Sequence, residues 1–385
     1  MLKVSARTTL ALTPTLSCSA GEGEHRMRGT IRDSQRNRAV TLIDLASDTK
    51  TRPTPGMRAA MAAAEVGDER AHEDPTVNRL NARCAELLGK EAAVFLPSGT
   101  MANEIALAVH CRPGEEVLCD ATSHIIGFEG GGPAALAGVM IQPLAGKRGI
   151  FDADQLRAAI RPDRPYAPRQ RLVEVEQTAN LGGGSIWPLA TLDAIGETAH
   201  TAGLVTHMDG ARLLNACVAS GVGAADYARG FDSVWIDFSK GLGAPGGAVL
   251  AGTRDFVTDA NRWKQRIGGA MRQSGIIAAA CEYALDHHVQ RLADDHANAQ
   301  RLAAGIAAIA GLRIDPATIE TNLVYFDVTA AALDAEALCA ALLQAGVRMG
   351  PMGARTVRAV THLDVTAAQI ETALAALHSA VSNAS

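Results

Sequence analysis

Apolar residues follow two alternating patterns along this chain, short apolar or β-branched runs and longer stretches with helical spacing. From Ala39 onward the short runs predict strands, and helical patterns fill the intervals between them. The expected strands span residues 92–96, 116–119, 139–143, 171–176, 204–208, 233–238 and 247–251. Such alternation is typical of an α/β fold in which helices cover both faces of a sheet.

The pattern changes after a long helical region at residues 273–309, where 322–326 and 356–360 predict strands of a second, smaller unit. A chain of 385 residues also exceeds the usual size of one hydrophobic core.

The first forty residues have many Arg, Ser and Thr, few acids and no apolar periodicity, so we expect disorder there. A transit peptide would have a similar composition, but an Arg-rich genome or a start codon placed too early, with Met27 as one alternative, explains it equally well. We expect a disordered extension at 1–40, a large ligand-binding domain at 41–290 and a small domain at 291–385.

Charge and composition argue against several classes of partner. The net charge is −5, from 36 basic and 41 acidic residues, and no basic run could follow a phosphodiester backbone, so we expect no nucleic-acid partner. No apolar run reaches the roughly eighteen residues that cross a bilayer. The cysteines are scattered singly without a C-x-x-C pair, which favours a reducing compartment and hence the cytoplasm. The adjacent His287 and His288 would point to different sides of a helix, and we expect no bound metal.

The segment PSGTMANEIALAVH, residues 97–110, follows an apolar strand and opens a helix. Free backbone N–H groups of Ser98, Gly99 and Thr100 would lie at the positive end of that helix, where phosphate binds, and Gly99 would let the backbone approach closely. An ordinary helix cap would have the same sequence pattern. The segment alone therefore leaves a phosphate site and a plain cap both open.

Two further apolar strands end in charged residues. LVTHMDGARL ends in Asp209, and an acid there would face the ligand crevice of an open α/β sheet, although a turn-initiating Asp is the alternative. SVWIDFSKGLGAP places Lys240 after a buried strand and before a glycine-rich turn, an unusual position for lysine. Burial would lower the pKa of Lys240 and free its amine as a nucleophile.

An acid at one strand end, a lysine at the next and a phosphate-binding turn match the needs of pyridoxal phosphate. Lys240 would hold the cofactor as an imine, and Asp209 would keep its pyridine nitrogen protonated. The turn at residues 98–100 would anchor the phosphate. We therefore expect pyridoxal 5'-phosphate as the cofactor and a small molecule as the substrate.

From residue 42 to the C-terminus the chain resembles the threonine aldolases of the β-eliminating lyase group, within the aspartate-aminotransferase type of fold. The matching segments are DLASDTKTRPTPGMRAAM, EDPTVNRL, ELLGKEAAVFLPSGTMANEIAL, SHIIGFEGGGPAALAG, HMDGARLLNA, FDSVWIDFSKGLGAPGG, GGAMRQSG and RAVTHLD. The resemblance implies fold type I of the pyridoxal-phosphate enzymes, with a mostly parallel seven-stranded sheet in the large domain. It also implies cleavage of L-threonine, L-allo-threonine or related β-hydroxy-α-amino acids to glycine and an aldehyde.

The same resemblance implies roles for further residues. His124 would stack on the cofactor ring, and it is the only candidate base in a matching motif, although an ordered water could serve instead. Arg212 would reach the cofactor's phenolic oxygen or the substrate carboxylate, which Ser47 and Arg358 would also bind. Arg272 resembles a residue that reaches a phosphate across a subunit interface, which implies a homo-oligomer, a dimer or a tetramer, with its active site at that interface.

The chain departs from the family pattern in places. ERAHEDPT has Ala71 and His72 where relatives often carry an aromatic and a small residue, EQTANLGGG has Gln177 and Ala179 in place of Asn and His, and Gln265 stands near a commonly basic position. These changes bear on substrate preference more than on imine chemistry.

A β-eliminating lyase or an aldolase for aryl side chains is the main alternative. A nicotinamide oxidoreductase would need G-x-G-x-x-G after a strand, which is missing. A binding protein that keeps the fold but has no catalytic activity would not need both Lys240 and Asp209.

Overall fold

A seven-stranded sheet is the largest element of the structure, a computed structural model that describes residues 42–383. The extension expected at residues 1–40 lies outside the described residues. The strand order is β2-β8-β7-β6-β5-β3-β4, and within this sheet β8 alone runs antiparallel to its neighbours. The strands are β2 Ala92–Leu96, β3 Glu116–Asp120, β4 Met140–Leu144, β5 Gln170–Glu176, β6 Val205–Gly210, β7 Ser233–Asp237 and β8 Ala248–Gly252. Each lies within two residues of its predicted bounds, and the predicted α/β class is confirmed.

Helices cover both faces of this sheet, so its central strands are buried throughout and read as continuous apolar runs. On one face α3 (Gly99–His110) and α9 (Arg254–Arg266) pack against side chains such as Trp235 and Leu250. On the other face α2 (Pro75–Leu87), α6 (Leu189–Thr201) and α10 (Gly275–His287) enclose the largest apolar core.

Shorter helices connect these layers. They are η1 Asp48–Lys50, α1 Pro55–Ala62, η2 Glu69–Ala71, α4 His124–Gly127, the π-helical turn η3 Pro133–Ala137, α5 Ala153–Ala159, α7 Leu213–Ser220 and α8 Ala224–Ala228. No helix within residues 42–383 combines the length and the apolar character that a membrane crossing requires.

A second sheet, of order β12-β13-β10-β9, is antiparallel. Its strands are β9 Leu312–Arg313, β10 Leu323–Val328, β12 Gly350–Pro351 and β13 Thr356–Val360, and its helices are α11 Leu292–Ala307, η4 Pro316–Thr318, α12 Ala335–Gln344 and α13 Ala367–Ser382. β10 and β13 are the two strands predicted for the smaller unit. Together with α11, α12 and α13 they enclose an apolar core of their own.

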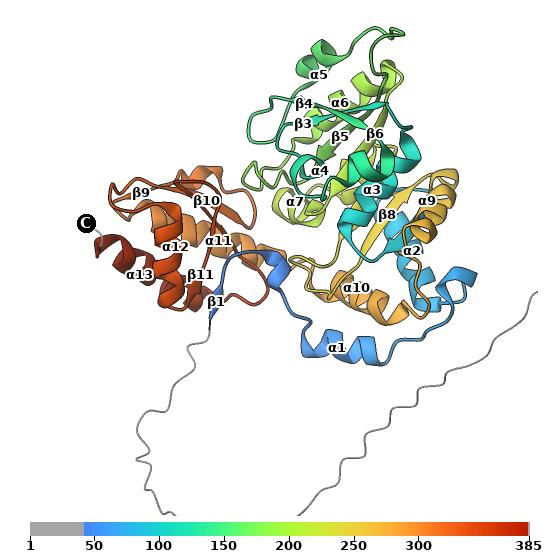
Figure 1. Cartoon of the computed structure of the whole chain (residues 1–385). Coiled ribbons are helices and arrows are strands. Elements are labelled where there is room, and N and C mark those ends of the chain that lie inside the picture. The colour runs from blue at the N-terminus through green and yellow to red at the C-terminus, as the bar shows by residue number, and fades with distance from the viewer. Residues whose placement is uncertain (1–41, 384–385) are drawn as a thin grey trace, which may run out of the picture. The chain divides into compact units, whose positions relative to one another are not determined.

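The start of the described chain belongs to this second core. Strand β1 (Ile43–Asp44) pairs in parallel with β11 (Val347–Arg348), so in Figure 1 the blue β1 lies among red elements. Ile43 and Leu45 are buried in the second core. The residues just before Ser47 are therefore held by the C-terminal part of the chain. The division of domains at residues 290 and 291 stays a prediction.

The carboxyl ends of the parallel strands meet at one edge of the large sheet. β5 ends at Glu176, β6 at Gly210 directly after Asp209, and β7 at Asp237. β2 runs parallel to β7, so α3 also begins at this edge. Ligands of open α/β sheets bind outside this edge.

Candidate active site

A cavity of about 370 Å³ opens at this edge of the sheet. Nine of the ten site residues predicted from the sequence line it, and Arg272 does not. The nine are Ser47, Ser98, Gly99, Thr100, His124, Asp209, Arg212, Lys240 and Arg358. Acidic and aromatic residues that the sequence reasoning missed line it as well, namely Phe128, Glu129, Glu176, Trp235 and Asp237.

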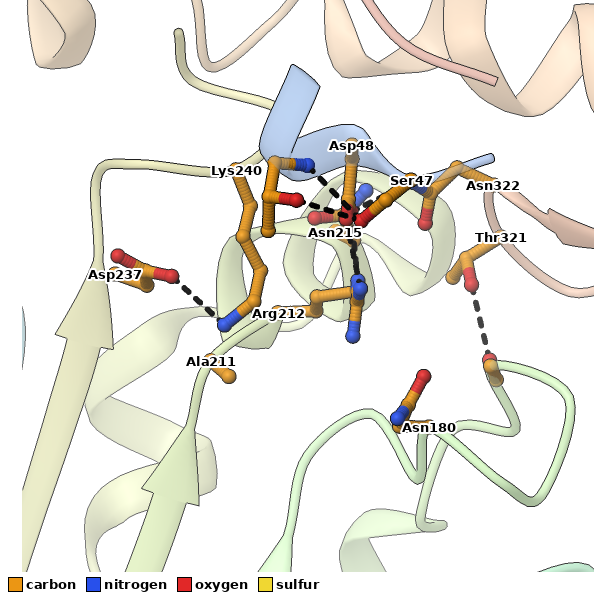
Figure 2. Close-up of polar contacts among 12 residues, drawn as sticks. Ser47, Asp48, Asn180, Ala211, Arg212, Asn215, Asp237, Lys240, Thr321 and Asn322 are labelled. Atoms are coloured by element: carbon orange, nitrogen blue, oxygen red, sulfur yellow. Dashed lines mark hydrogen bonds and ion pairs between the residues drawn. The ribbon is translucent and has the colours of Figure 1, made fainter. Parts of the chain in front are cut away.

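Lys240 lies just beyond β7, and its side chain is 19% exposed. Its Nζ donates a hydrogen bond to Oδ2 of Asp237 at 2.7 Å, and Figure 2 shows the side chain of Lys240 extended toward that carboxylate. Burial is the largest influence and lowers the pKa of Lys240, but Asp237 and Asp209 together raise it above its ordinary value. The prediction of a lowered pKa is wrong, because it overlooked an acid three residues earlier in the same apolar strand. Without a bound cofactor, the side chain of Lys240 is therefore a protonated ammonium. It must lose a proton before it can act as a nucleophile.

Asp209 is 1% exposed, and each of its carboxylate oxygens accepts a hydrogen bond. Its Oδ2 accepts from Nδ2 of Asn103 at 2.8 Å, and its Oδ1 accepts from the backbone N–H of Ala211 at 2.9 Å. Burial raises the pKa of Asp209, and the nearby His124 and Lys240 offset part of that rise. At the end of β5, burial and the charge of Asp209 raise the pKa of Glu176 to about 8. Glu176 is therefore mostly neutral at pH 7, which limits the negative charge around Asp209.

His124 begins α4 and sits beside Glu129. Its Nδ1 lies 2.6 Å from Oε1 of Glu129, and its ring stacks on Phe128 with 5.3 Å between centroids. Burial is the largest influence and lowers the pKa of His124, but Glu129 and Asp209 raise it above its ordinary value. One ligand atom from each of His124, Glu129 and Asp209 lies within 4.8 Å of the others. The three side chains are close enough to share one ion, and the expectation of no bound metal stays a prediction.

The amino end of α3 provides the predicted phosphate turn. Oγ of Ser98 accepts from the backbone N–H of Met101 at 3.3 Å and caps the helix. The first N–H groups of a helix have no helical acceptor, so those of Gly99 and Thr100 remain available. A Cβ on Gly99 would lie 2.3 Å from Cη2 of Trp235. Glycine is therefore required by packing against Trp235, a reason that the sequence did not reveal.

Arg212 is buried and paired with Asp48, a residue that the sequence reasoning missed. Its Nε and Nη2 donate to the two carboxylate oxygens of Asp48 at 2.7 and 2.8 Å, as Figure 2 shows. Nδ2 of Asn322 donates to the same carboxylate at 3.0 Å. Burial raises the pKa of Asp48, but the Arg212 guanidinium outweighs it and holds that pKa well below its ordinary value. Most of the guanidinium fork of Arg212 is thus occupied, and Nη1 is the remaining group for a ligand.

Ser47 and Arg358 form another wall of the cavity, although they are far apart in the sequence. Oγ of Ser47 accepts from the backbone N–H of Thr49 at 3.2 Å. On β13, Nη2 of Arg358 donates to the backbone carbonyl of Ala46 at 3.1 Å, and its Nη1 donates to Oδ1 of Asn180 at 3.4 Å. Among the described residues Nε of Arg358 has no partner. This guanidinium therefore has capacity to bind an anion.

The remaining sequence features lie away from the cavity. The side chain of Arg272 is 56% exposed and its Nη1 lies 3.3 Å from Oδ2 of Asp68. A single chain does not bring Arg272 to the site. The residues at which the chain departs from its family pattern do not line the cavity either, and these are Ala71, His72, Gln177, Ala179 and Gln265.

Comparison with known proteins gives a consistent result. Residues 44–329 match the family described as beta-eliminating lyase. The chain is 40% identical over 337 residues to a probable low-specificity L-threonine aldolase 2 of Arabidopsis thaliana, covering 86% of this chain and 95% of that protein. It is 41% identical over 333 residues to the low specificity L-threonine aldolase of Escherichia coli K12, covering 86% and 96%.

A solved structure of Leishmania major threonine aldolase superposes with a TM-score of 0.75 at 21% identity, covering 88% of this chain and 99% of that one. This likeness confirms the predicted fold. The family match extends over most of the chain, and the residues quoted above for the resemblance lie almost entirely inside it. This chain belongs to the beta-eliminating lyase family and, within it, to the threonine aldolases.

Proposed function

We propose that this protein is a pyridoxal-phosphate-dependent lyase that cleaves L-threonine, L-allo-threonine or related β-hydroxy-α-amino acids to glycine and an aldehyde. Relatives at about 40% identity carry the name low-specificity L-threonine aldolase. The observation that carries the proposal is that Lys240 and Asp209 line one cavity at the edge of the sheet. The family description of β-eliminating lyase keeps β-elimination as the alternative reaction.

The residues of the cavity fit pyridoxal phosphate in charge and in shape. The amino end of α3 offers unpaired N–H groups for a phosphate, and the buried Asp209 offers a carboxylate for a protonated ring nitrogen. Lys240 supplies the primary amine that can join the cofactor aldehyde. The ring of Trp235 and that of His124 line the space between these groups. The cavity of about 370 Å³ lies within the usual range for a small ligand.

The bound cofactor supplies the electron sink that accepts the electron pair of the breaking Cα–Cβ bond. The protein's own part begins with the amine. Asp237 already accepts a 2.7 Å hydrogen bond from the Lys240 ammonium, so it is placed to take the proton that the amine must lose. In our proposal Asp237 is therefore the proton acceptor of Lys240.

Substrate orientation falls to Arg358. Its planar guanidinium can bind the substrate carboxylate through two hydrogen bonds, and Ser47 and Nη1 of Arg212 lie around the same cavity. Fixing the carboxylate decides which bond at Cα is aligned for cleavage. The proton of the β-hydroxyl then needs an acceptor. His124 has one ring nitrogen bound to Glu129, and the other can take this proton directly or through a water.

A product assay tests the proposed function. Purified protein is incubated with pyridoxal phosphate and threonine, allo-threonine or phenylserine, and glycine, aldehyde, pyruvate and ammonia are each measured. We expect glycine and aldehyde in equal amounts, and no product from a Lys240→Ala variant. Pyruvate with ammonia as the main products would favour β-elimination, and the absence of any reaction would reject a lyase.

We also propose that the active form is a homo-oligomer, at least a dimer, in which Arg272 reaches the cofactor phosphate of a second copy. Arg272 is largely exposed and does not line the cavity of its own chain, which supports a role outside it. A mixture of Lys240→Ala and Arg272→Ala chains tests this. Shared sites should restore about one quarter of wild-type activity through mixed dimers, because each mixed dimer holds one intact site. No recovery, with both variants folded, would reject the shared site.

We propose the cytoplasm as the location. The six cysteines within residues 42–383 are all free thiols, and five of them are buried. Unpaired cysteines are usual in a reducing compartment. Fractionation with an antibody against the native protein would test this location.

A further inference from the structure

A line of polar side chains, half-buried at His110 and buried at the others, leads from α3 through β7 and β6 to Asp209. It joins His110 and Asn103 on α3 to Ser233 on β7 and His207 on β6. Nε2 of His110 lies 2.8 Å from Oγ of Ser233, which lies 2.8 Å from Nδ1 of His207. Nε2 of His207 lies 3.3 Å from Oδ1 of Asn103, whose Nδ2 donates to Asp209 at 2.8 Å.

The orientation of the Asn103 amide is fixed by its neighbours. The indole N–H of Trp235 can only donate, and it lies 2.7 Å from Oδ1 of Asn103. That oxygen is therefore the acceptor, and the amide nitrogen faces two carboxylates, Asp209 at 2.8 Å and Glu129 at 2.9 Å. One amide group thus donates to the acid of the predicted pyridine site and to the partner of His124.

The same logic fixes the direction of the whole line. Because Oδ1 of Asn103 accepts, Nε2 of His207 must carry the hydrogen. In a neutral ring Nδ1 of His207 then accepts, so the hydroxyl of Ser233 donates to it. The oxygen of Ser233 is left to accept from Nε2–H of His110. Burial lowers the pKa of His207 to about 3 and that of His110 to about 4, so both rings are neutral at pH 7.

Every hydrogen bond in this line therefore points the same way, from His110 toward the carboxylate of Asp209. Asn103, His207 and Ser233 are fully buried, and hydrogen bonds in such surroundings strengthen one another. We infer that the relay His110, Ser233, His207 and Asn103 is a positioning device that keeps Asp209 ionised and aimed at the ring nitrogen of the cofactor. The inference rests on the proposed function.

The relay compensates for the burial of Asp209, which would otherwise lose its charge. Burial favours the neutral form of Asp209, and a neutral acid would not hold a protonated ring nitrogen. A second carboxylate, that of Glu129, bonds to the same Asn103 amide and adds to this difficulty. Asn103 does not line the cavity, so its hydrogen bond stabilises the charge of Asp209 without occupying ligand space.

Cofactor binding to two ring types tests this inference. The dissociation constants of pyridoxal phosphate and of its 1-deaza analogue, which has carbon in place of the ring nitrogen, are measured by spectral titration of the cofactor-free protein. Asn103→Leu should weaken binding of pyridoxal phosphate by about tenfold to a hundredfold, the usual effect of one hydrogen bond to a charged group. Binding of the 1-deaza analogue should change by less than about threefold, because it has no ring nitrogen for Asp209 to hold.

More distant links should have smaller effects of the same kind. His207→Phe should weaken pyridoxal phosphate selectively but less than Asn103→Leu, and Ser233→Ala less again. Thr206→Val is the matched control. Thr206 is fully buried next to His207 on β6, but its hydroxyl bonds to Gly230 and Asp232 and not to the relay. This control should leave both dissociation constants unchanged. If Asn103→Leu does not fold, Ser233→Ala keeps every cavity-lining residue and still tests the relay.

Equal loss of affinity for both ring types in Asn103→Leu would reduce Asn103 to a packing residue and overturn the inference. Selective loss in Asn103→Leu with none in His207→Phe and Ser233→Ala would overturn the relay. A wild-type protein that binds neither ring type would instead overturn the proposed function, and the inference with it.

Discussion

Two walls of the cavity differ in how firmly their residues are held. On the ring-facing wall, which we define as Lys240, Asp209 and His124, each side chain makes a hydrogen bond of 2.6 to 2.8 Å to a buried partner. On the carboxylate-facing wall, Ser47 and Arg358, the bonds of Arg358 measure 3.1 and 3.4 Å. The first wall is built on adjoining parts of one sheet and its helices, and the second on segments from both ends of the chain.

This difference separates chemistry from substrate choice. Groups that stabilise a transition state act best when their geometry is fixed in advance by neighbouring side chains. Arg358, with longer hydrogen bonds and an Nε that has no partner among the described residues, can instead adjust to different substrates. We therefore expect changes on the ring-facing wall to abolish chemistry and changes on the carboxylate-facing wall to alter substrate binding.

Asp209→Asn should have the largest effect. It removes the charge that holds the protonated ring nitrogen, and loss of one partner of a buried pair costs about 3–5 kcal/mol, or roughly 10²- to 10⁴-fold. We expect kcat to fall by this factor in assays at saturating cofactor. An Asp209→Asn variant within tenfold of wild type would show that the ring-facing wall does not depend on this charge.

Asp48→Asn tests the buried pair of Asp48 and Arg212, in which Asp48 directly follows Ser47 and Arg212 comes three residues after Asp209. Arg212 would be left in the interior with one neutral acceptor, so we expect the free energy of unfolding to fall by about 3 kcal/mol. Because the pKa of Asp48 is depressed in the folded protein, its contribution is present above its ordinary pKa of 3.8 and is lost as pH falls toward the depressed value. Urea unfolding at pH 7 measures the loss, and exposed Arg229→Ala is the control.

Arg358→Lys should have a smaller effect, mainly on substrate binding. Lysine keeps the charge but lacks the planar fork, and we expect KM for threonine to rise about tenfold to a hundredfold with kcat less affected. Steady-state kinetics with wild type and variant would separate the two constants. An unchanged KM with a lowered kcat would contradict the division between the two walls.

How far the sequence could predict this site follows the same division. Lys240, Asp209 and the turn at residues 98–100 could be found because each ends or follows an apolar strand, and the position of strand ends is set by local pattern. The pairing of Ser47 with Arg358 could be named only from the family resemblance. No local pattern encodes the pairing of β1 with β11 that carries Ser47 to the same wall.

The buried polar partners were missed for a different reason. Asp237 interrupts an apolar strand and Asn103 interrupts an apolar helix, and both signals were visible in the sequence. Their meaning depended on what lies opposite each side chain, which only the fold provides. Asp237 reversed the predicted pKa shift of Lys240 for this reason.

Glu129→Gln should have the smallest effect of these substitutions, a change in the pKa of His124. The neutral amide cannot stabilise the imidazolium, so we expect NMR titration to give His124 a lower pKa than in wild type. In wild type the pair stabilises the fold most between the ordinary pKa values of 4.5 for Glu and 6.5 for His. That contribution is lost as pH rises through the raised pKa of His124, and also as pH falls through the lowered pKa of Glu129. An unchanged titration of His124 would contradict the contact.

The most direct test of the account is the identity of the lysine that binds the cofactor. The protein is incubated with pyridoxal phosphate, reduced with borohydride, digested and analysed by mass spectrometry, with Lys264→Arg as a control because Lys264 is a second buried lysine. We predict the reduced cofactor on Lys240 in wild type and in Lys264→Arg, and none in Lys240→Ala. Label on Lys264 or on another lysine, or no label on the folded wild-type protein, would contradict the account.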